Sequence, residues 1–165
     1  ALPDVYGGFG TSLRFYGVDF SIGFTYQLGG QVLDQGYRFY MNSPAGTSTG
    51  NNYHHDLLNS WTPENSGSNI PRFAYNDSNQ AAVSDRFLTS ASYLNIQNIT
   101  LGYTLPKRIT RKFLVENLRI YLACDNVWYW SKRQGLDPRQ SINGITNPYY
   151  YAPIRTFSGG VTVTF

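Results

Sequence analysis

Residues 18–28 read VDFSIGFTYQL and alternate strictly between two kinds of side chain. The even positions are apolar or aromatic, and the odd positions are small or polar (Asp19, Ser21, Gly23, Thr25 and Gln27). A period of two is that of a β-strand with one face in an apolar medium and the other in water. These 11 residues, tilted near 45°, would rise about 25 Å, the height of the apolar band of an outer-membrane barrel. The stretch therefore predicts a transmembrane β-strand.

The composition does not resemble that of an ordinary helix-rich cytosolic domain. The 165 residues include 14 Tyr, 10 Phe and 3 Trp, but one Met and one Cys. Aromatic rings with a polar end are typical of membrane interfaces and of sugar-binding surfaces. The single cysteine, Cys124, has no partner for an internal disulfide. We interpret it as a small buried or lipid-facing residue and assign it no chemistry.

The net charge of +3 and the sequence pI of about 9.0 raise the question of a nucleic-acid partner. Four of the basic residues, however, fall in the short segment 107–112, which is better explained as a solvated turn, so we predict no nucleic-acid binding.

Residues 1–6 lack the basic and apolar regions of a signal peptide. Because a barrel protein needs such a signal to leave the cytoplasm, we expect the sequence to be part of a longer chain.

The same alternation predicts four further strands, at about 9–16, 89–105, 118–130 and 154–165. A bulge near Gln97 and Asn98 would reconcile the two halves of the third strand, whose apolar residues change parity there. Segments 29–88 and 131–153 lack the alternation and are predicted as long extracellular loops, with the last strand ending in the periplasm. The predicted fold is all-β, a transmembrane antiparallel barrel. Five strands cannot close one, so we expect only part of it.

Five motifs of this chain, taken in order, resemble one family. They are YGGFGTSLRF (6–15), WTPENSGSNIPR (61–72), SDRFLTSASYLNIQNITLGYTLP (84–106), DNVWYWSKRQGLDPRQS (125–141) and RTFSGGVTVTF (155–165). Together they resemble the carboxyl-terminal part of the SusC/RagA-type TonB-dependent outer-membrane transporters. The resemblance spans nearly the whole sequence.

The resemblance implies the last five strands of a 22-stranded barrel. It also implies a plug inside the barrel, a SusD-like surface lipoprotein, and import of oligosaccharides or peptides across the outer membrane of a Gram-negative bacterium. Energy would come from the TonB–ExbB–ExbD complex through an N-terminal part that this sequence lacks. Outer-membrane lipid and the barrel-assembly machinery are the remaining expected partners. A final amphipathic strand that ends in an aromatic residue resembles the signal read by that machinery, and Val161, Val163 and Phe165 are assigned to it.

Two groups of residues are predicted to act in such a transporter. Aromatic rings in the predicted external loops are candidate ligand contacts: Trp61, Tyr149, Tyr150 and Tyr151. Packing within the loops explains these rings equally well. Charged and polar residues on the wet face of the strands are predicted to face the lumen and to pair with the plug: Asp19, Gln27, Arg119 and Asp125. Arg133, Asp137 and Arg139 are predicted to form an ion-paired loop brace.

His54, His55 and Asp56 are of metal-ligand or catalytic type, but two adjacent histidines on an extended chain point in different directions. No third ligand has motif spacing, and nearby Ser60 lacks a G-x-S-x-G elbow. We therefore predict loop polar residues, no enzyme, no cofactor and no metal.

The alternative fold is a soluble β-sandwich that binds glycans. Its strands of about 5 to 6 residues are shorter than the uninterrupted run at 18–28.

Overall fold

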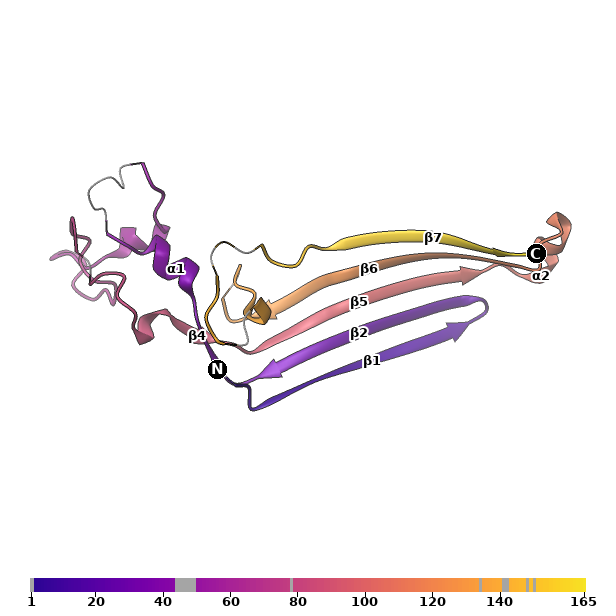
Figure 1. Ribbon diagram of the computed structural model, residues 1–165, viewed down its shortest axis with the longest axis horizontal. Coiled ribbons are helices and arrows are strands. Elements are labelled where there is room, and N and C mark those ends of the chain that lie inside the picture. Colours follow the sequence, from indigo (N-terminus) through magenta and orange to yellow (C-terminus); the bar gives the residue numbers. More distant parts are fainter. Residues whose placement is uncertain are drawn as a thin grey trace.

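The computed structural model describes residues 2–43, 50–77, 79–133, 135–140, 143–147, 149 and 151–165. Five long strands form one sheet in the order β1-β2-β5-β6-β7, and every neighbouring pair is antiparallel. They are β1 (Val5–Phe15), β2 (Val18–Leu28), β5 (Tyr93–Thr104), β6 (Asn117–Ser131) and β7 (Thr156–Thr164). Figure 1 shows them side by side along the long axis of the molecule.

The long and the short connections lie at opposite ends of this sheet (Figure 1). At one end, β1 turns into β2 through Tyr16 and Gly17, whose φ angles of 46° and 87° are both positive, as a tight two-residue hairpin turn requires. The segment after β5, predicted as a basic turn, forms the short helices α2 (Lys107–Thr110) and η3 (Arg111–Phe113), and its basic residues are exposed. The two long loops both leave the other end.

The pairing register aligns apolar side chains on one side of all five strands. Ile22, for example, lies opposite Thr11 on β1 and Ile99 on β5, and Ile99 lies opposite Cys124 on β6. We call this side the apolar face; its larger members are Phe9, Leu13, Phe15, Val18, Phe20, Ile22, Phe24, Tyr26, Leu94, Ile96, Ile99, Leu101, Tyr103, Leu118, Ile120, Leu122, Trp128, Trp130, Phe157, Val161 and Val163. The other side, the polar face, carries Asp19, Ser21, Thr25, Asn98, Thr100, Arg119 and Asp125.

A β-bulge keeps these faces continuous. Ile96 pairs with Trp128 and Asn98 pairs with Asp125. Gln97 on β5 and residues 126–127 on β6 are therefore unpaired between these two strands. The register of β5 against β2 shifts at the same point. Asn126, on the β6 side of the irregularity, has a positive φ of 51°. The bulge predicted near Gln97 and Asn98 is confirmed, and it explains why apolar residues change parity along β5.

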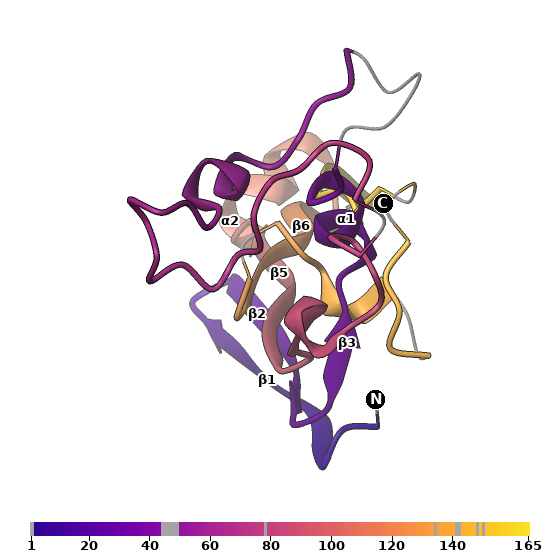
Figure 2. The same cartoon turned by 90° about the vertical axis from the view of Figure 1, so that its left-hand side faces the viewer.

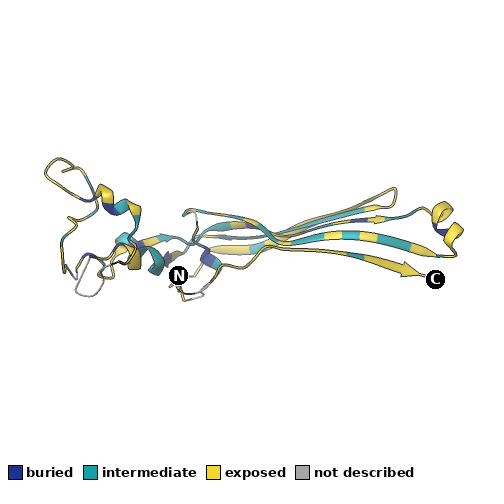
Figure 3. Cartoon of the chain, turned by 90° about the horizontal axis from the view of Figure 1, so that it is seen from above, coloured by how far each residue is buried: buried dark blue, intermediate teal, exposed yellow. Residues whose placement is uncertain are grey.

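The hydrophobic core lies in the loops and not in the sheet (Figure 3). Leu33, Met41, Leu57 and Phe87 form one buried cluster, and all four belong to the segment between β2 and β5. By contrast, apolar residues of the sheet such as Leu122 (64% exposed) remain accessible. The described helices are all too short, or insufficiently apolar, to cross a membrane. No second sheet covers the apolar face within the described ranges, so the β-sandwich alternative is not supported.

The segment between β2 and β5 contains more structure than the sequence predicts. Its elements are β3 (Gln31–Leu33), α1 (Gln35–Tyr40), the 3₁₀ helices η1 (His55–Asn59) and η2 (Asp85–Phe87), and β4 (Leu88–Ser90). β3 and β4 pair antiparallel in a separate two-stranded sheet. The strand predicted at 89–105 is therefore two strands. The β3–β4 ladder ends before Ala91, whose N–H donates to the carbonyl of Gly30 at 3.1 Å.

Candidate functional site at the loop junction

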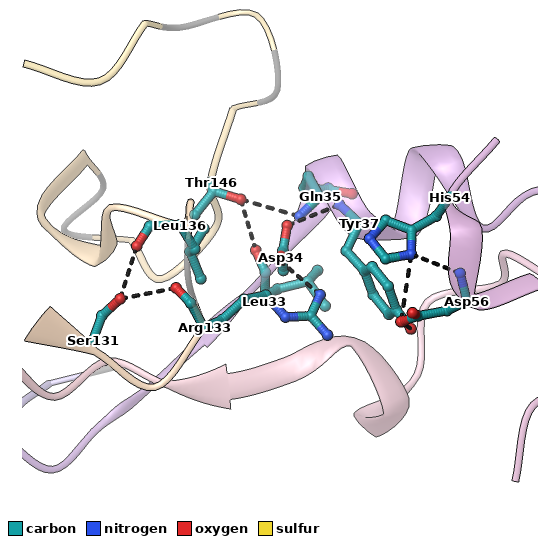
Figure 4. A network of polar contacts seen from close by, with 10 residues as sticks. All are labelled: Leu33, Asp34, Gln35, Tyr37, His54, Asp56, Ser131, Arg133, Leu136 and Thr146. Atoms are coloured by element: carbon teal, nitrogen blue, oxygen red, sulfur yellow. Dashed lines mark hydrogen bonds and ion pairs between the residues drawn. The ribbon is translucent and has the colours of Figure 1, made fainter. Parts of the chain in front are cut away.

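The two long loops meet in a backbone interaction centred on Leu33, at the end of β3. The N–H of Leu33 donates to the carbonyl of Gly144 (2.7 Å), and the N–H of Thr146 donates to the carbonyl of Leu33 (3.1 Å). Leu33 and Ile145 form a parallel β-bridge between them. We call this contact and the side chains around it the loop junction (Figure 4). Residues more than 100 positions apart in sequence are thereby held together.

Asp34 is the central side chain of the junction (Figure 4). It is 5% exposed and caps helix α1, because its Oδ1 accepts the N–H of Tyr37 at 2.9 Å. Its other oxygen, Oδ2, accepts a hydrogen bond from Arg133 at 3.0 Å. The guanidinium of Arg133 also lies 3.7 Å from the ring centroid of Tyr37. One arginine of the second loop thus contacts both a buried carboxylate and an aromatic ring of the first.

A second set of polar contacts extends from Tyr37 (Figure 4). Its hydroxyl donates to Oδ2 of Asp56 at 2.8 Å, and its ring lies edge-on to the imidazole of His54, 4.7 Å between centroids. Burial, and then the hydrogen bond to Asp56, raise the pKa of the Tyr37 hydroxyl above its usual value. Nδ1 of His54 accepts the N–H of Asp56 at 3.2 Å and so caps η1. Tyr37 therefore connects the helix cap to the 3₁₀ turn.

His54 and His55 do not point in different directions, which corrects the prediction. Their ring centroids are 4.7 Å apart, and both rings approach Asp56: His54 Nδ1 lies 3.4 Å from Oδ2, and His55 Nε2 lies 3.0 Å from Oδ1. The prediction failed because the chain is extended only at His54 and turns into a 3₁₀ helix at His55. The three side chains offer ligand atoms within 4.8 Å of one another. His54 Nδ1 and Asp56 Oδ2 already take part in hydrogen bonds, so we retain the interpretation as loop polar residues.

Ser60 is arranged as a structural residue. It is 5% exposed, and its hydroxyl donates to the carbonyl of Leu57 at 2.6 Å. A nucleophilic serine needs a base that accepts its proton, and this hydroxyl is directed to the backbone instead.

A pocket of about 320 Å³ opens at the junction. Both loops contribute to its lining: Asp34, Gly36, Tyr37, Tyr40 and His54 come from the first, and Arg133, Gly135, Leu136, Asp137, Thr146, Asn147 and Ala152 from the second. Carboxylate, guanidinium, imidazole and phenol groups therefore meet around one small space. Such a set can bind a polar ligand through hydrogen bonds and ring contacts. The sequence did not predict Asp34 or Tyr37, because nothing near them in the sequence indicates contact with Arg133.

The three residues predicted to form an ion-paired brace in the second loop are all ion-paired, and one of them pairs outside that loop. Nε and Nη2 of Arg139 donate to the two carboxylate oxygens of Asp137, at 2.8 and 2.6 Å, and Asp137 is 1% exposed. The hydrogen bond to Asp137 raises the pKa of Arg139 above its usual value. Arg133 pairs with Asp34 of the other loop. The brace therefore has one contact within its loop and one between loops.

Three of the aromatic residues predicted to bind ligand, Trp61, Tyr149 and Tyr151, do not line the junction pocket. Trp61 is 38% exposed, while Tyr149 and Tyr151 are 77% and 97% exposed. The fourth, Tyr150, lies outside the described residues. Figure 1 shows the first loop extending beyond the end of the sheet, and Figure 2 looks onto this loop end along the long axis of the molecule.

Two of the charges predicted to face the lumen pair with each other on the polar face. Arg119 donates through Nε and Nη2 to both oxygens of Asp19, at 3.0 and 2.5 Å. The pair crosses β5 at Gly102, where a Cβ atom would lie 2.5 Å from the carboxylate oxygens of Asp19. Only glycine leaves room for the two side chains to meet. Gln27 donates to the carbonyl of Ala91 at 3.3 Å, and Asp125 is exposed on the same face.

Comparison with known proteins connects this architecture to one group. No protein-family model matches the chain. The TonB-dependent receptor P3 of Formosa agariphila is 26% identical over 173 residues, and the TonB-dependent receptor SusC of Bacteroides thetaiotaomicron is 28% identical over 164 residues. These alignments cover 99% and 98% of this chain. The chain corresponds to the carboxyl-terminal part of a SusC-type TonB-dependent receptor.

Solved structures agree on the fold of this receptor segment. The RagAB peptide importer in its closed-closed state superposes with a TM-score of 0.82 at 24% identity, over 99% of this chain and 17% of that one. A second structure, of the RagAB peptide transporter, gives a TM-score of 0.80 at 25% identity. The antiparallel sheet thus matches a portion of a TonB-dependent transporter barrel. The segment spans about one sixth of the length of its curated relatives, 16% and 15% for the two named above.

Proposed function

We propose that this receptor segment supplies the last five strands of a 22-stranded barrel in the outer membrane of a Gram-negative bacterium. The complete protein would import bulky nutrients past a plug, with energy from the TonB–ExbB–ExbD complex. The polar face would line the lumen and the apolar face would contact lipid. In this arrangement both long loops lie outside the cell and the end of β7 lies in the periplasm.

One observation carries the proposal: the apolar face runs unbroken across all five strands and remains uncovered by the described chain. On that face Phe157 is 76% exposed and Leu122 is 64% exposed. A soluble protein would bury such a surface, whereas lipid tails cover it without cost. The strands of 9 to 15 residues have the length that a tilted crossing requires.

Cysteine labelling of the complete receptor in outer-membrane vesicles tests this placement. In a Cys124→Ala background, Ile22→Cys on the apolar face should react with a lipid-soluble maleimide but not with a charged one. Ser21→Cys, one residue away on the polar face, is the matched control and should show the opposite preference or be protected by the plug. Equal reaction of both positions with the charged reagent would contradict the transmembrane placement.

We further propose that the substrate is an oligosaccharide or a peptide, delivered together with a SusD-like lipoprotein that covers the loops. Exposed rings in the loops support a glycan, because flat rings stack on sugar faces. The name of the RagAB peptide importer supports the peptide alternative. Trp61→Ala and Tyr151→Ala should reduce oligosaccharide uptake by cells, while Tyr16→Ala, at the opposite end of the sheet, should not. Unchanged uptake in both loop variants would favour the peptide.

Val161, Val163 and Phe165 are proposed as the signal for the barrel-assembly machinery. They lie on or directly after β7, and Phe165 is 88% exposed. Deletion of Phe165 should lower the amount of folded receptor in the outer membrane, measured by its heat-modifiable migration on gels. A normal amount of folded receptor would remove this assignment.

A further inference from the structure

The loop end of β6 differs from the rest of the apolar face. Leu122 and Cys124 occupy that face along the middle of the strand, and after the bulge Trp128 and Trp130 take their place. β7 pairs with β6 only as far as Asp125, so residues 126–131 have no described strand partner on that side. Beyond the ladder, Nδ2 of Asn126 donates to the carbonyl of Ile154 at 3.2 Å. Both tryptophans are 51% exposed. The strand therefore ends in a shelf of two indole rings beside an open edge.

A cation lies against this shelf. The guanidinium carbon of Arg155, in the segment that leads into β7, is 5.8 Å from the ring centroid of Trp128. Arg155 is exposed and forms no ion pair with the residues that the structure describes. A pocket of about 670 Å³ is lined by Trp128, Trp130, Pro153 and Arg155 together with residues of the polar side. Arg139, which also lines it, is already neutralised by Asp137.

A second pocket follows directly along the chain. It measures about 360 Å³ and is lined by Arg86, Phe87, Leu88, Thr89, Lys132 and Arg133. Lys132 is exposed and comes one residue after the end of β6. Nε of Arg86 is buried without a hydrogen-bond partner among the described atoms. No Asp or Glu occurs among the described residues that line either pocket.

Aliphatic residues, indole rings and cations thus follow one another from the middle of the apolar face to the loop end. This order matches the layers of a lipid from its acyl chains through its interface to a charged headgroup. The pockets combine an apolar shelf with Lys132 and Arg155, two cations that have no ion-pair partner among the described residues. The complementary ligand is therefore an amphiphile with an anionic headgroup. Phosphate accepts several charge-assisted hydrogen bonds from Arg and Lys.

We propose that the shelf and the two pockets form a binding site for a phosphorylated glycolipid of the outer leaflet. Its acyl chains would lie along Trp128 and Trp130, and its phosphates would be bound by Arg155 and Lys132. The inference rests on the proposed membrane placement and goes beyond the import function. It assigns these residues to contact with the surrounding lipid and not with the nutrient.

Lipid binding by the complete receptor tests the site. Purified, delipidated receptor is titrated with diphosphoryl lipid A, or with chemically dephosphorylated lipid A, and bound lipid is counted by native mass spectrometry. The double variant Lys132→Gln/Arg155→Gln should weaken binding of the diphosphoryl form at least about tenfold. The matched control Arg108→Gln/Lys112→Gln removes two charges from the opposite end of the sheet and should change it less than about twofold. Trp128→Ala should weaken binding of both lipid forms.

Unchanged binding in the Lys132/Arg155 double variant would overturn the inference, as would an equal loss in the control variant. Equal affinity of the parent receptor for the two lipid forms would overturn it as well. Heat-modifiable migration of every variant is measured first. A receptor that never inserts contradicts the proposed function itself, whereas an inserted receptor with unchanged lipid binding contradicts the lipid site alone.

Discussion

The sheet and the loop end of this receptor segment are stabilised in different ways. The sheet is built from long antiparallel ladders, yet most of its apolar face is accessible in the isolated chain. The loop end has the opposite character. Its buried residues include Met41 at 0% and Phe87 at 2% exposure, and Asp34, buried at 5%, is paired with Arg133.

The difference indicates where each region obtains its stability. The ladders satisfy the backbone of β2, β5 and β6 within the chain, but the apolar face gains its burial only from an external apolar phase. The loop end buries its own hydrophobic cluster and closes it with polar contacts between two distant segments. Membrane insertion should therefore depend on the sheet, and the shape of the surface outside the membrane should depend on the loop core and the loop junction.

The largest expected effect comes from truncating Phe87, which should destabilise the loop end and leave the sheet intact. Phe87→Ala removes a side chain that packs with Leu33, Met41 and Leu57, and truncations of this kind cost about 3–5 kcal/mol. Hydrogen exchange of the complete receptor should show faster exchange in segment 29–92 and unchanged exchange in β5 and β6. Phe113→Ala, in the exposed helix η3 at the opposite end of the sheet, is the control and should alter neither region. Faster exchange throughout the sheet would mean that the two regions are not independent.

A charge on the apolar face tests the sheet. Ile22→Arg places a cation near the middle of that face, where arginine on a lipid-facing strand costs about 2–4 kcal/mol. The fraction of receptor that migrates as a folded, heat-modifiable species should fall, whereas Ser21→Arg on the polar face should insert nearly as well as the parent. If both variants insert equally, the face around Ile22 does not contact lipid.

Most of the sheet could be predicted from sequence because its two faces meet different media. Side chains of β2 alternate between apolar and polar because they point alternately to the two faces. The observed strand therefore begins and ends where the alternating sequence does, at residues 18 and 28. The signal weakens where side chains are missing. β1 begins at Val5, four residues before the predicted start, because Gly7 and Gly8 carry no side chain that could mark a face. The 22-strand count stays a prediction from the resemblance.

The loop end could not be predicted in the same way, since its elements are short and depend on distant partners. Helix α1 has six residues and is capped by Asp34, whose charge is balanced by Arg133, 99 positions further along the chain. The sequence identified Arg133 as part of a brace but contained no signal for its partner. His54 and His55 illustrate a related limit, because their relative orientation depends on a 3₁₀ turn that the sequence does not mark.

Breaking the loop junction should have an intermediate effect that reaches both loops. Arg133→Gln leaves the buried carboxylate of Asp34 without its cation, and losing a hydrogen bond to a charged group costs about 1.5–3 kcal/mol. Limited proteolysis should then cleave the complete receptor faster in both 29–92 and 131–155. Lys132→Gln removes the same charge from the adjacent, exposed residue and should leave both rates unchanged. Faster cleavage of the second loop alone would show that Arg133 does not connect the loops.

The smallest expected effect concerns the hydroxyl of Tyr37. Burial and the hydrogen bond to Asp56 favour the neutral phenol and raise its pKa above the usual value of about 10. Its contribution to stability is therefore complete below pH 10 and is lost as the pH rises through the higher pKa of the folded state. The hydrogen bond to the partly exposed Asp56 carboxylate contributes about 1.5 kcal/mol, the lower end of the range for a charged acceptor. Subtracting the alkaline absorbance titration of Tyr37→Phe from that of the parent receptor should give a transition centred above pH 10. A transition at or below pH 10 would mean that Tyr37 is solvated and does not link helix α1 to η1.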